Sequence, residues 1–126
     1  MRIILCGFGV VGQNFAKLLL SRSEDLYALH GLKPRIVGVF DSKGAAASSA
    51  GLDLNRLLEV KKRDGSIRKY HNKEKDANGT DMISGMEAEV LIETTPSNYK
   101  DAEPGMSHIV NAMKNGLHVI TVNKGP

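Results

Sequence analysis

The sequence has one cysteine, no tryptophan and no long apolar run, and each shortage excludes a class of protein. Cys6 has no second cysteine with which to form an intramolecular disulfide. The four histidines share no metal-ligand spacing, so we assign no role to them and expect no metal site; they are His30, His71, His108 and His118. No apolar run approaches the roughly 18 to 20 residues that cross a bilayer. Residues 1–11 lack the features of a signal peptide, so we expect a cytoplasmic protein that binds no membrane.

Basic residues outnumber acidic ones, giving a formal net charge of +3 and a pI near 9.1. Much of the excess comes from one stretch, made up of Lys61, Lys62, Arg63, Arg68, Lys69, Lys73 and Lys75. Such a stretch is usually a solvated face, and the main alternative is a contact with the phosphates of a dinucleotide. Aromatic residues make up only 5% of the chain and no nucleic-acid-binding motif is present, so we expect no nucleic acid partner.

A length of 126 residues fits one domain, and its hydrophobic pattern alternates between strand and helix. The apolar run Arg2–Cys6 predicts a buried strand, and apolar residues at helical spacing predict a helix over residues 10–22. The polar residues 21–34 predict a surface connection to a second strand, Arg35–Phe40. The start of the chain therefore predicts a strand, helix, strand unit.

The middle of the sequence is less regular. Residues 42–51 are rich in Ala, Ser and Gly, which fits a loop or a weak helix, and we favour the loop. Asp53 is expected to cap a short helix that runs to Lys62 and is closed by Gly65. The apolar face of this helix is formed by Leu54, Leu57 and Leu58. Residues 66–84 have no clear period and predict an exposed excursion.

Regular patterns return near the end of the chain. Residues 89–94 and 118–122 predict two more strands, and the helix between them begins near Pro104 and closes at Asn115 and Gly116. Its core face is expected to be Met106, Ile109, Val110 and Met113. Strands alternating with helices imply a parallel sheet covered on both faces. We therefore expect an α/β, doubly wound fold of the Rossmann type, in which the whole chain forms one dinucleotide-binding domain.

A glycine-rich turn follows the first predicted strand. Residues 7–12 have the spacing G-x-G-x-x-G, and the expected cofactor-binding residues here are Gly7, Phe8, Gly9, Val10, Val11 and Gly12. Gly7 permits a tight turn, Gly9 lets the backbone approach a pyrophosphate, and Gly12 lets the helix pack close to the sheet. The helix N-terminus then directs N–H groups at the phosphates. A turn that serves packing alone is the alternative, but the flanking strand and helix favour the cofactor.

Asp41 ends the second predicted strand, where an acid can accept hydrogen bonds from the adenosine ribose. Its separation from the glycine turn exceeds the usual spacing, and the polar residues 21–34 account for the excess. An acid here favours NAD, because a 2′-phosphate would meet like charge. Lys43 could compensate such a phosphate, so both NAD and NADP remain open. The alternative role for Asp41 is that of a cap or turn residue.

Two later segments go beyond a generic dinucleotide fold: Glu-Thr-Thr-Pro-Ser-Asn at 93–98, and Asn-Gly-Leu-His-Val-Ile-Thr-Val-Asn-Lys-Gly-Pro at 115–126. With Gly105, Ser107 and His108, they resemble homoserine dehydrogenase. The resemblance runs in order through the whole chain and includes Asp-Ser-Lys-Gly at 41–44. Its most specific part is the terminal Val-Ile-Thr-Val-Asn-Lys-Gly-Pro. The resemblance implies an oxidoreductase that uses NAD(P) to interconvert L-homoserine and L-aspartate 4-semialdehyde, in threonine and methionine biosynthesis.

The resemblance also implies roles for particular residues. It places Lys124 beside the nicotinamide and the substrate hydroxyl, where it takes part in proton transfer. A lysine desolvated near a cationic nicotinamide suits this task, because its pKa is lowered. The further cofactor-binding residues that we expect are Asp41, Ser42, Lys43, Thr94, Thr95, Pro96, Asn123 and Lys124. A plain loop at 94–96 and an exposed terminal lysine are the alternatives.

In one respect the sequence departs from the family it resembles. The family's chain continues into a dimerising, substrate-binding domain that supplies a second lysine and acidic residues for homoserine. We therefore expect this chain to be the cofactor-binding half of a longer enzyme, inactive on homoserine by itself and a homodimer at full length. The alternative is a stand-alone dinucleotide-binding regulatory module.

Overall fold

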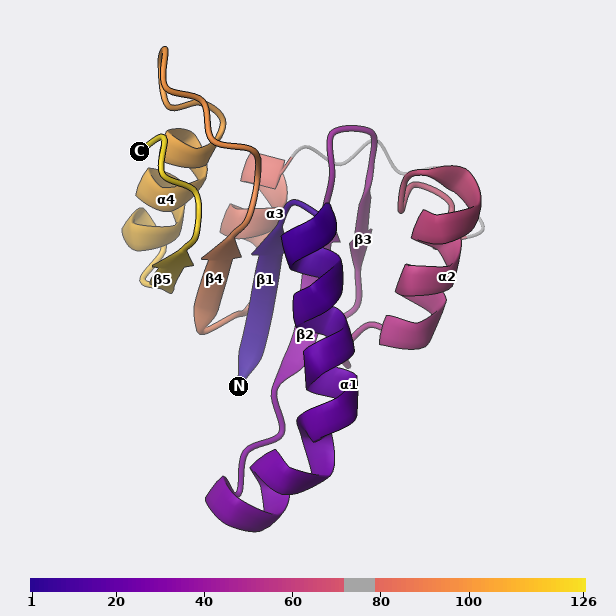
Figure 1. Cartoon of the computed structure of the whole chain (residues 1–126). Helices are drawn as coiled ribbons and strands as arrows, with labels where there is room; N and C mark the ends of the chain where they lie inside the picture. Colours follow the sequence, from indigo (N-terminus) through magenta and orange to yellow (C-terminus); the bar gives the residue numbers. More distant parts are fainter. Residues whose placement is uncertain (72–78) are drawn as a thin grey trace.

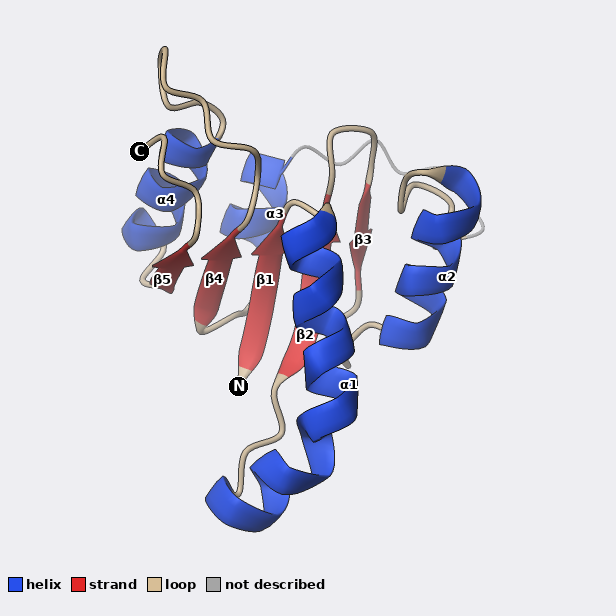
Figure 2. Ribbon diagram, viewed as in Figure 1, coloured by secondary structure: helices blue, strands red, loops and turns tan. Residues whose placement is uncertain are grey.

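The computed structural model, which describes residues 1–71 and 79–126, shows a five-stranded sheet with helices on both faces (Figure 1, Figure 2). The strands are β1 (Arg2–Cys6), β2 (Arg35–Phe40), β3 (Ala45–Ala47), β4 (Val90–Glu93) and β5 (His118–Thr121). The helices are α1 (Val10–His30), α2 (Leu54–Asp64), α3 (Gly79–Gly85) and α4 (Gly105–Lys114). The strand order is β3-β2-β1-β4-β5, and every pair is parallel except β2 with β3. The predicted doubly wound α/β fold is confirmed, with one short antiparallel strand at its edge.

Alternate residues of β1 point to opposite faces of the sheet. Ile3 and Leu5 belong to the core under α1 and α2, while Ile4 and Cys6 belong to the core under α3 and α4. Because both faces are covered, the strand is apolar throughout, which is why it reads as a continuous run rather than an alternating one.

The central parallel strands end at the same edge of the sheet. The last residue of β1, Cys6, is paired in register with Phe40 of β2 and with Glu93 of β4. The residues that follow these strands in the chain, including Gly7 and Asp41, therefore lie at one edge. Ligands of open α/β sheets bind at this carboxyl edge.

Helix α1 is longer than predicted. It continues to His30, so the predicted end at Arg22 and the surface connection over residues 21–34 were wrong. The second half of α1 is polar but rich in residues that favour helix, and its stop is Gly31, which adopts a left-handed φ of 64°. The connection to β2 is only residues 31–34.

Two predictions for the middle of the chain were also wrong in part. Residues 42–51 contain strand β3, whose small alanines pair with β2 and are buried at Ala45 and Ala46. Residues 66–84 contain a buried Ile67 and the helix α3, which buries Met82 and Ile83. Residues 72–78, with Lys73 and Lys75 of the basic stretch, lie outside the described residues. The predicted α2 is confirmed, with Asp53 accepting a hydrogen bond from the Arg56 N–H and Gly65 as its C-cap.

Helix α4 lies where it was predicted but buries a different face. Its buried residues are Gly105, His108 and Ala112, whereas Met106 and Met113 are 37% and 58% exposed. Small residues on the inner face let the helix approach the sheet closely, so the larger methionines lie outside. Among the described residues, no helix is long and apolar enough to cross a membrane.

Candidate functional site

The glycine turn joins β1 to α1 at the carboxyl edge of the sheet. Gly7 has a φ of +88°, and a Cβ there would lie 2.9 Å from the carbonyl carbon of Thr94. A Cβ on Gly12 would lie 2.5 Å from the carbonyl oxygen of Gly7. The fold itself therefore requires glycine at both positions. Gly9 differs, because among the described atoms outside its own chain neighbours nothing lies within 4 Å of the place its Cβ would take.

The open space at Gly9 lies at the start of α1. Gly9 is the N-cap of this helix, and it has no side chain with which to cap the first N–H groups. Val10 and Val11, the first helical residues, are 77% and 49% exposed. The first N–H groups of an α-helix have no intrahelical partner and carry partial positive charge. The turn thus provides a cradle for an anion such as a diphosphate.

A cleft of about 380 Å³ extends from the glycine turn in two directions. Its lining residues are Gly7, Phe8, Gly9, Phe40, Asp41, Ser42, Lys61, Gly79, Thr95, Pro96, Pro104 and His108. Because β1 lies between β2 and β4, one arm of the cleft is on the β2 side, at Asp41 and Ser42, and the other is on the β4 side, at Thr95 and Pro96. The structure therefore brings together predicted residues from three separate segments of the chain. Lys43, Asn123 and Lys124 are not among the residues that line this cleft.

The carboxylate of Asp41 is engaged within the protein. One oxygen accepts hydrogen bonds from the N–H groups of Lys43 and Gly44, at 2.8 and 2.9 Å, and from the hydroxyl of Ser66, at 3.3 Å. The other accepts from Lys61 Nζ and from the N–H of Ile67, both at 3.0 Å. Burial alone would raise the pKa of Asp41, but these bonds outweigh it and hold the pKa below its usual value. A carboxylate has about four acceptor positions, so this geometry supports the turn role, and the ribose role stays a prediction.

A second cleft, of about 410 Å³, lies beside Asp41. It is lined by Lys43, Asp64, Ser66, Arg68 and Lys69. Ser66 also contacts Asp41, which makes this cleft a neighbour of the first. Part of the basic stretch therefore gathers at the end of the candidate cofactor site where an adenosine ribose is expected, which favours the phosphate-contact alternative for those residues.

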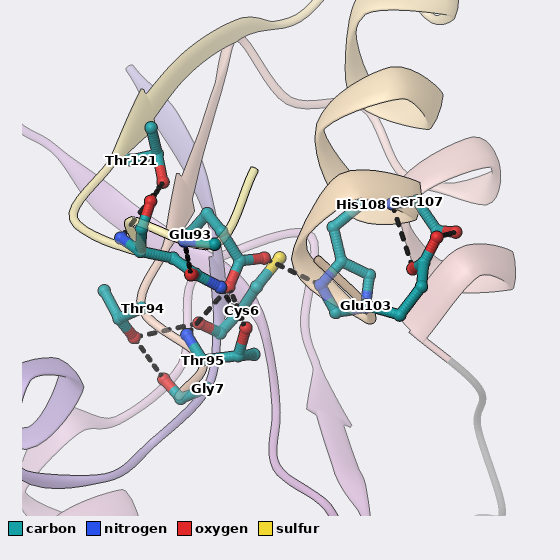
Figure 3. Close-up of polar contacts among 11 residues, drawn as sticks. Cys6, Gly7, Glu93, Thr94, Thr95, Glu103, Ser107, His108 and Thr121 are labelled. Carbon is teal, nitrogen blue, oxygen red and sulfur yellow. Dashed lines mark hydrogen bonds and ion pairs between the residues drawn. The ribbon is translucent and has the colours of Figure 1, made fainter. Parts of the chain in front are cut away.

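The loop after β4 is tied to the glycine turn (Figure 3). The hydroxyl oxygen of Thr94 lies 2.8 Å from the carbonyl oxygen of Cys6 and 2.9 Å from that of Gly7. The N–H of Thr94 also donates to the Cys6 carbonyl at 2.8 Å. Thr94 therefore lies behind the cleft and fixes its wall, while Thr95 lines it.

Glu93 and His108, to which we assigned no role from the sequence, form a buried hydrogen-bonded pair beside the cleft (Figure 3). Glu93 is fully buried, and its Oε2 lies 2.7 Å from His108 Nδ1. Burial alone would raise the pKa of Glu93, but the hydrogen bonds from His108 and Thr95 lower it below its usual value. One signal in the sequence could have pointed to the pair: an acid, Glu93, at the end of an apolar strand.

Cys6 lies next to this pair. One potential ligand atom each from Cys6, Glu93 and His108 lies within 4.8 Å of the others. Glu93 and His108 already satisfy each other by their hydrogen bond, so the geometry needs no metal to explain it. Burial, and secondarily the charge of Glu93, raises the pKa of the Cys6 thiol. Cys6 is therefore an unreactive core residue, as its place in an apolar strand predicted.

The terminal Asn-Lys lies against the loop after β4. The side-chain amide of Asn123, which is buried, donates to Thr95 Oγ1 at 3.1 Å. The backbone N–H of Lys124 donates to Ser97 Oγ at 2.9 Å, and its side chain is exposed. The structure thus brings the predicted Asn123 and Lys124 together with the Thr-Thr-Pro loop.

This chain matches one family model over most of its length and several relatives over its whole length. A family model described as Glutamate/Leucine/Phenylalanine/Valine dehydrogenase matches residues 1–99. Homoserine dehydrogenase from Methanocaldococcus jannaschii is 39% identical over 126 residues, covering 100% of this chain and 37% of that protein. The NAD(+)-dependent homoserine dehydrogenase from Pseudomonas canavaninivorans is 32% identical, covering 99% of this chain and 36% of its own.

Among solved structures, homoserine dehydrogenase from Thermoplasma acidophilum superposes with a TM-score of 0.81 at 27% identity. The superposition covers 99% of this chain and 35% of that one. The chain therefore spans little more than a third of the length of the relatives it matches. The family model stops before α4, whereas the match to the homoserine dehydrogenase from Methanocaldococcus jannaschii also includes residues 100–126.

Proposed function

We propose that this chain, which belongs to the glutamate/leucine/phenylalanine/valine dehydrogenase family, forms the NAD(P)-binding part of an oxidoreductase that acts on L-homoserine. The observation that carries the proposal is the difference between Gly9 and its two neighbours in the motif. Packing accounts for Gly7 and Gly12, whereas no packing contact accounts for Gly9. An open backbone at the start of a helix is what a diphosphate requires.

The choice of homoserine as substrate rests on the end of the chain. Similarity to homoserine dehydrogenases continues through residues 100–126, beyond the span of the family model. This segment supplies Asn123, which contacts Thr95 in the wall of the cleft. A terminal Asn-Lys placed against the loop that lines the cleft suits the oxidation of an alcohol, which needs a basic group near the reacting hydroxyl.

The cofactor, when bound, supplies a nicotinamide that exchanges a hydride with the substrate. The residues of this chain bind and orient it. The N–H groups at the start of α1 hold the diphosphate, and the arm of the cleft at Thr95 and Pro96 receives the nicotinamide riboside. Lys124 would relay the proton of the substrate hydroxyl.

The proposal extends to the whole protein. It includes one dinucleotide-binding domain over residues 1–126, a separate domain for the substrate, and a homodimer. It also includes a role in threonine and methionine biosynthesis, a cytoplasmic location and no nucleic acid partner. The single cysteine, Cys6, is buried and supports the location, because one cysteine cannot form the intramolecular disulfide that is typical of proteins in an oxidising compartment.

The test is turnover by the whole protein that contains this chain. It is mixed with NAD⁺ or NADP⁺ and either L-homoserine or L-glutamate, and the reduced cofactor is followed by its absorbance. We expect turnover with homoserine and none with glutamate, and a fall in kcat in Lys124→Ala that is much larger than any change in cofactor affinity. Turnover of glutamate instead would overturn the choice of substrate, and cofactor binding without turnover of either would favour the regulatory module.

A further inference from the structure

Glu93 is a fully buried acid beside the cofactor cleft. Its Oε2 accepts a hydrogen bond from His108, and its Oε1 accepts two from Thr95, one from the N–H at 2.7 Å and one from the hydroxyl. Both carboxylate oxygens are thus committed, and the side chain is fully buried. An ionised carboxylate in such a place is stable only while its donors stay in position.

The hydrogen bonds continue from Thr95 to the end of the chain. Since the Thr95 hydroxyl donates to Glu93, its oxygen is available to accept from Asn123, and it does so at 3.1 Å. The other end of the Asn123 amide accepts from the N–H of Gly125 at 2.9 Å. These bonds fix the turn that contains Lys124.

Helix α4 closes the same network from the other side. His108 projects from its buried face toward Glu93 and packs edge-on against Phe40, with ring centroids 4.9 Å apart. At the start of the helix, a Cβ on Gly105 would lie 2.5 Å from the Asn123 amide nitrogen. The helix, the loop after β4 and the terminal turn are therefore packed as one unit. Two members of this unit, Thr95 and His108, line the cofactor cleft.

We propose that Glu93 and His108 are positioning residues that fix the nicotinamide end of the cleft, acting through Thr95 and Asn123. The inference rests on the proposed cofactor site, and it assigns the two ends of that site to different groups of residues. The glycine turn binds the diphosphate without this network, because Gly9 and the start of α1 contact none of its side chains in the bonds described above. The network governs only the arm that receives the nicotinamide riboside and the turn that bears Lys124.

The test compares two ligands that share a diphosphate. NADH contains the nicotinamide riboside, and ADP lacks it. Both are titrated calorimetrically into the protein and into Glu93→Gln, whose amide nitrogen cannot accept the bonds that the carboxylate oxygen accepts. We expect NADH to bind roughly 10-fold more weakly to the variant, the scale of one lost charged hydrogen bond, with the affinity for ADP unchanged. Glu89→Gln, at the opposite end of β4, is the matched control and should bind both ligands as the parent does.

Three further variants keep the test decisive if Glu93→Gln does not fold. Thr95→Val preserves the side-chain shape and removes the hydroxyl that joins Glu93 to Asn123, so it should weaken NADH alone. His108→Asn retains a donor toward Glu93 and should keep more NADH affinity than His108→Leu. Equal losses for both ligands would mean that the network only supports the fold, and unchanged NADH binding would mean that it has no role at the site. A parent protein that binds neither ligand would refute the cofactor site itself.

Discussion

Lys61 of α2 places its ammonium nitrogen 3.0 Å from the carboxylate of Asp41, the residue that follows β2. The two side chains are only 17% and 6% exposed. With the bonds from Ser66 and Ile67, this pair ties α2 and the segment after it to the carboxyl edge of the sheet. An acid that the motif suggested for ribose binding is therefore also a structural centre of this edge.

Replacing Asp41 with asparagine should destabilise the fold. Asparagine lacks the charge that pairs with Lys61, and its amide nitrogen cannot accept the bonds that one carboxylate oxygen now receives. We expect the free energy of unfolding to fall by about 1–3 kcal/mol, measured by urea denaturation. Asp53→Asn is the control, because asparagine caps a helix as well as aspartate, and it should be nearly neutral. An equally small effect at Asp41 would show that its hydrogen bonds contribute little.

Lys43 should influence the choice between NADH and NADPH. It lines the second cleft with Arg68 and Lys69, at the end of the site expected to receive the adenosine ribose. Lys43→Ala should weaken NADPH by roughly 3- to 10-fold, because a 2′-phosphate loses one charged partner, and leave NADH unchanged. Parallel titrations with the two cofactors check this, with Lys62→Ala as the control on the exposed side of α2. A matching loss for NADH would place the 2′-phosphate elsewhere.

Acid should destabilise the protein. The pKa values of Asp41, Glu89 and Glu93 are all below their usual values in the folded chain, so the unfolded chain binds more protons in acid. For Glu89, hydrogen bonds from Arg2 lower the pKa from 4.5 to about 2. The stability from this exposed pair is present above pH 4.5 and is lost as the pH falls toward 2.

The measurement is urea denaturation at a series of pH values across that window. Glu89→Gln should flatten the dependence of the unfolding free energy on pH, and added salt should do the same in part, because the Arg2–Glu89 pair is exposed to screening. A variant with the same slope as the parent would show that Glu89 keeps an ordinary pKa.

The features predicted correctly from sequence have local causes. Strands β1 and β2 are short apolar runs, and α2 has its start and stop signals, Asp53 and Gly65, directly before and after it in the sequence. The missed features depend on distant partners. Strand β3 is stable because β2 lies beside it, and polar residues after Arg22 continue α1 because nothing before Gly31 stops it.

The candidate site shows the same contrast between features with local causes and features that depend on distant partners. The glycine turn was predicted from its spacing, because it joins a strand to the helix that follows directly in the chain. The pairing of Glu93 with His108 joins the end of a strand to the middle of a helix, and only the packing of α4 on the sheet brings them together. The prediction of the inner face of α4 was likewise wrong, because the sequence pattern favoured large apolar residues over small ones.

The most direct test of the account is NAD(P)H binding by Gly9→Asp. Open space at Gly9 allows the substitution without a clash, so circular dichroism and the unfolding midpoint should match those of the parent. The added carboxylate lies where we place the diphosphate, so the rise in cofactor fluorescence on titration should be lost. A folded Gly9→Asp variant that binds NADH or NADPH as tightly as the parent would contradict the placement of the cofactor on the glycine turn.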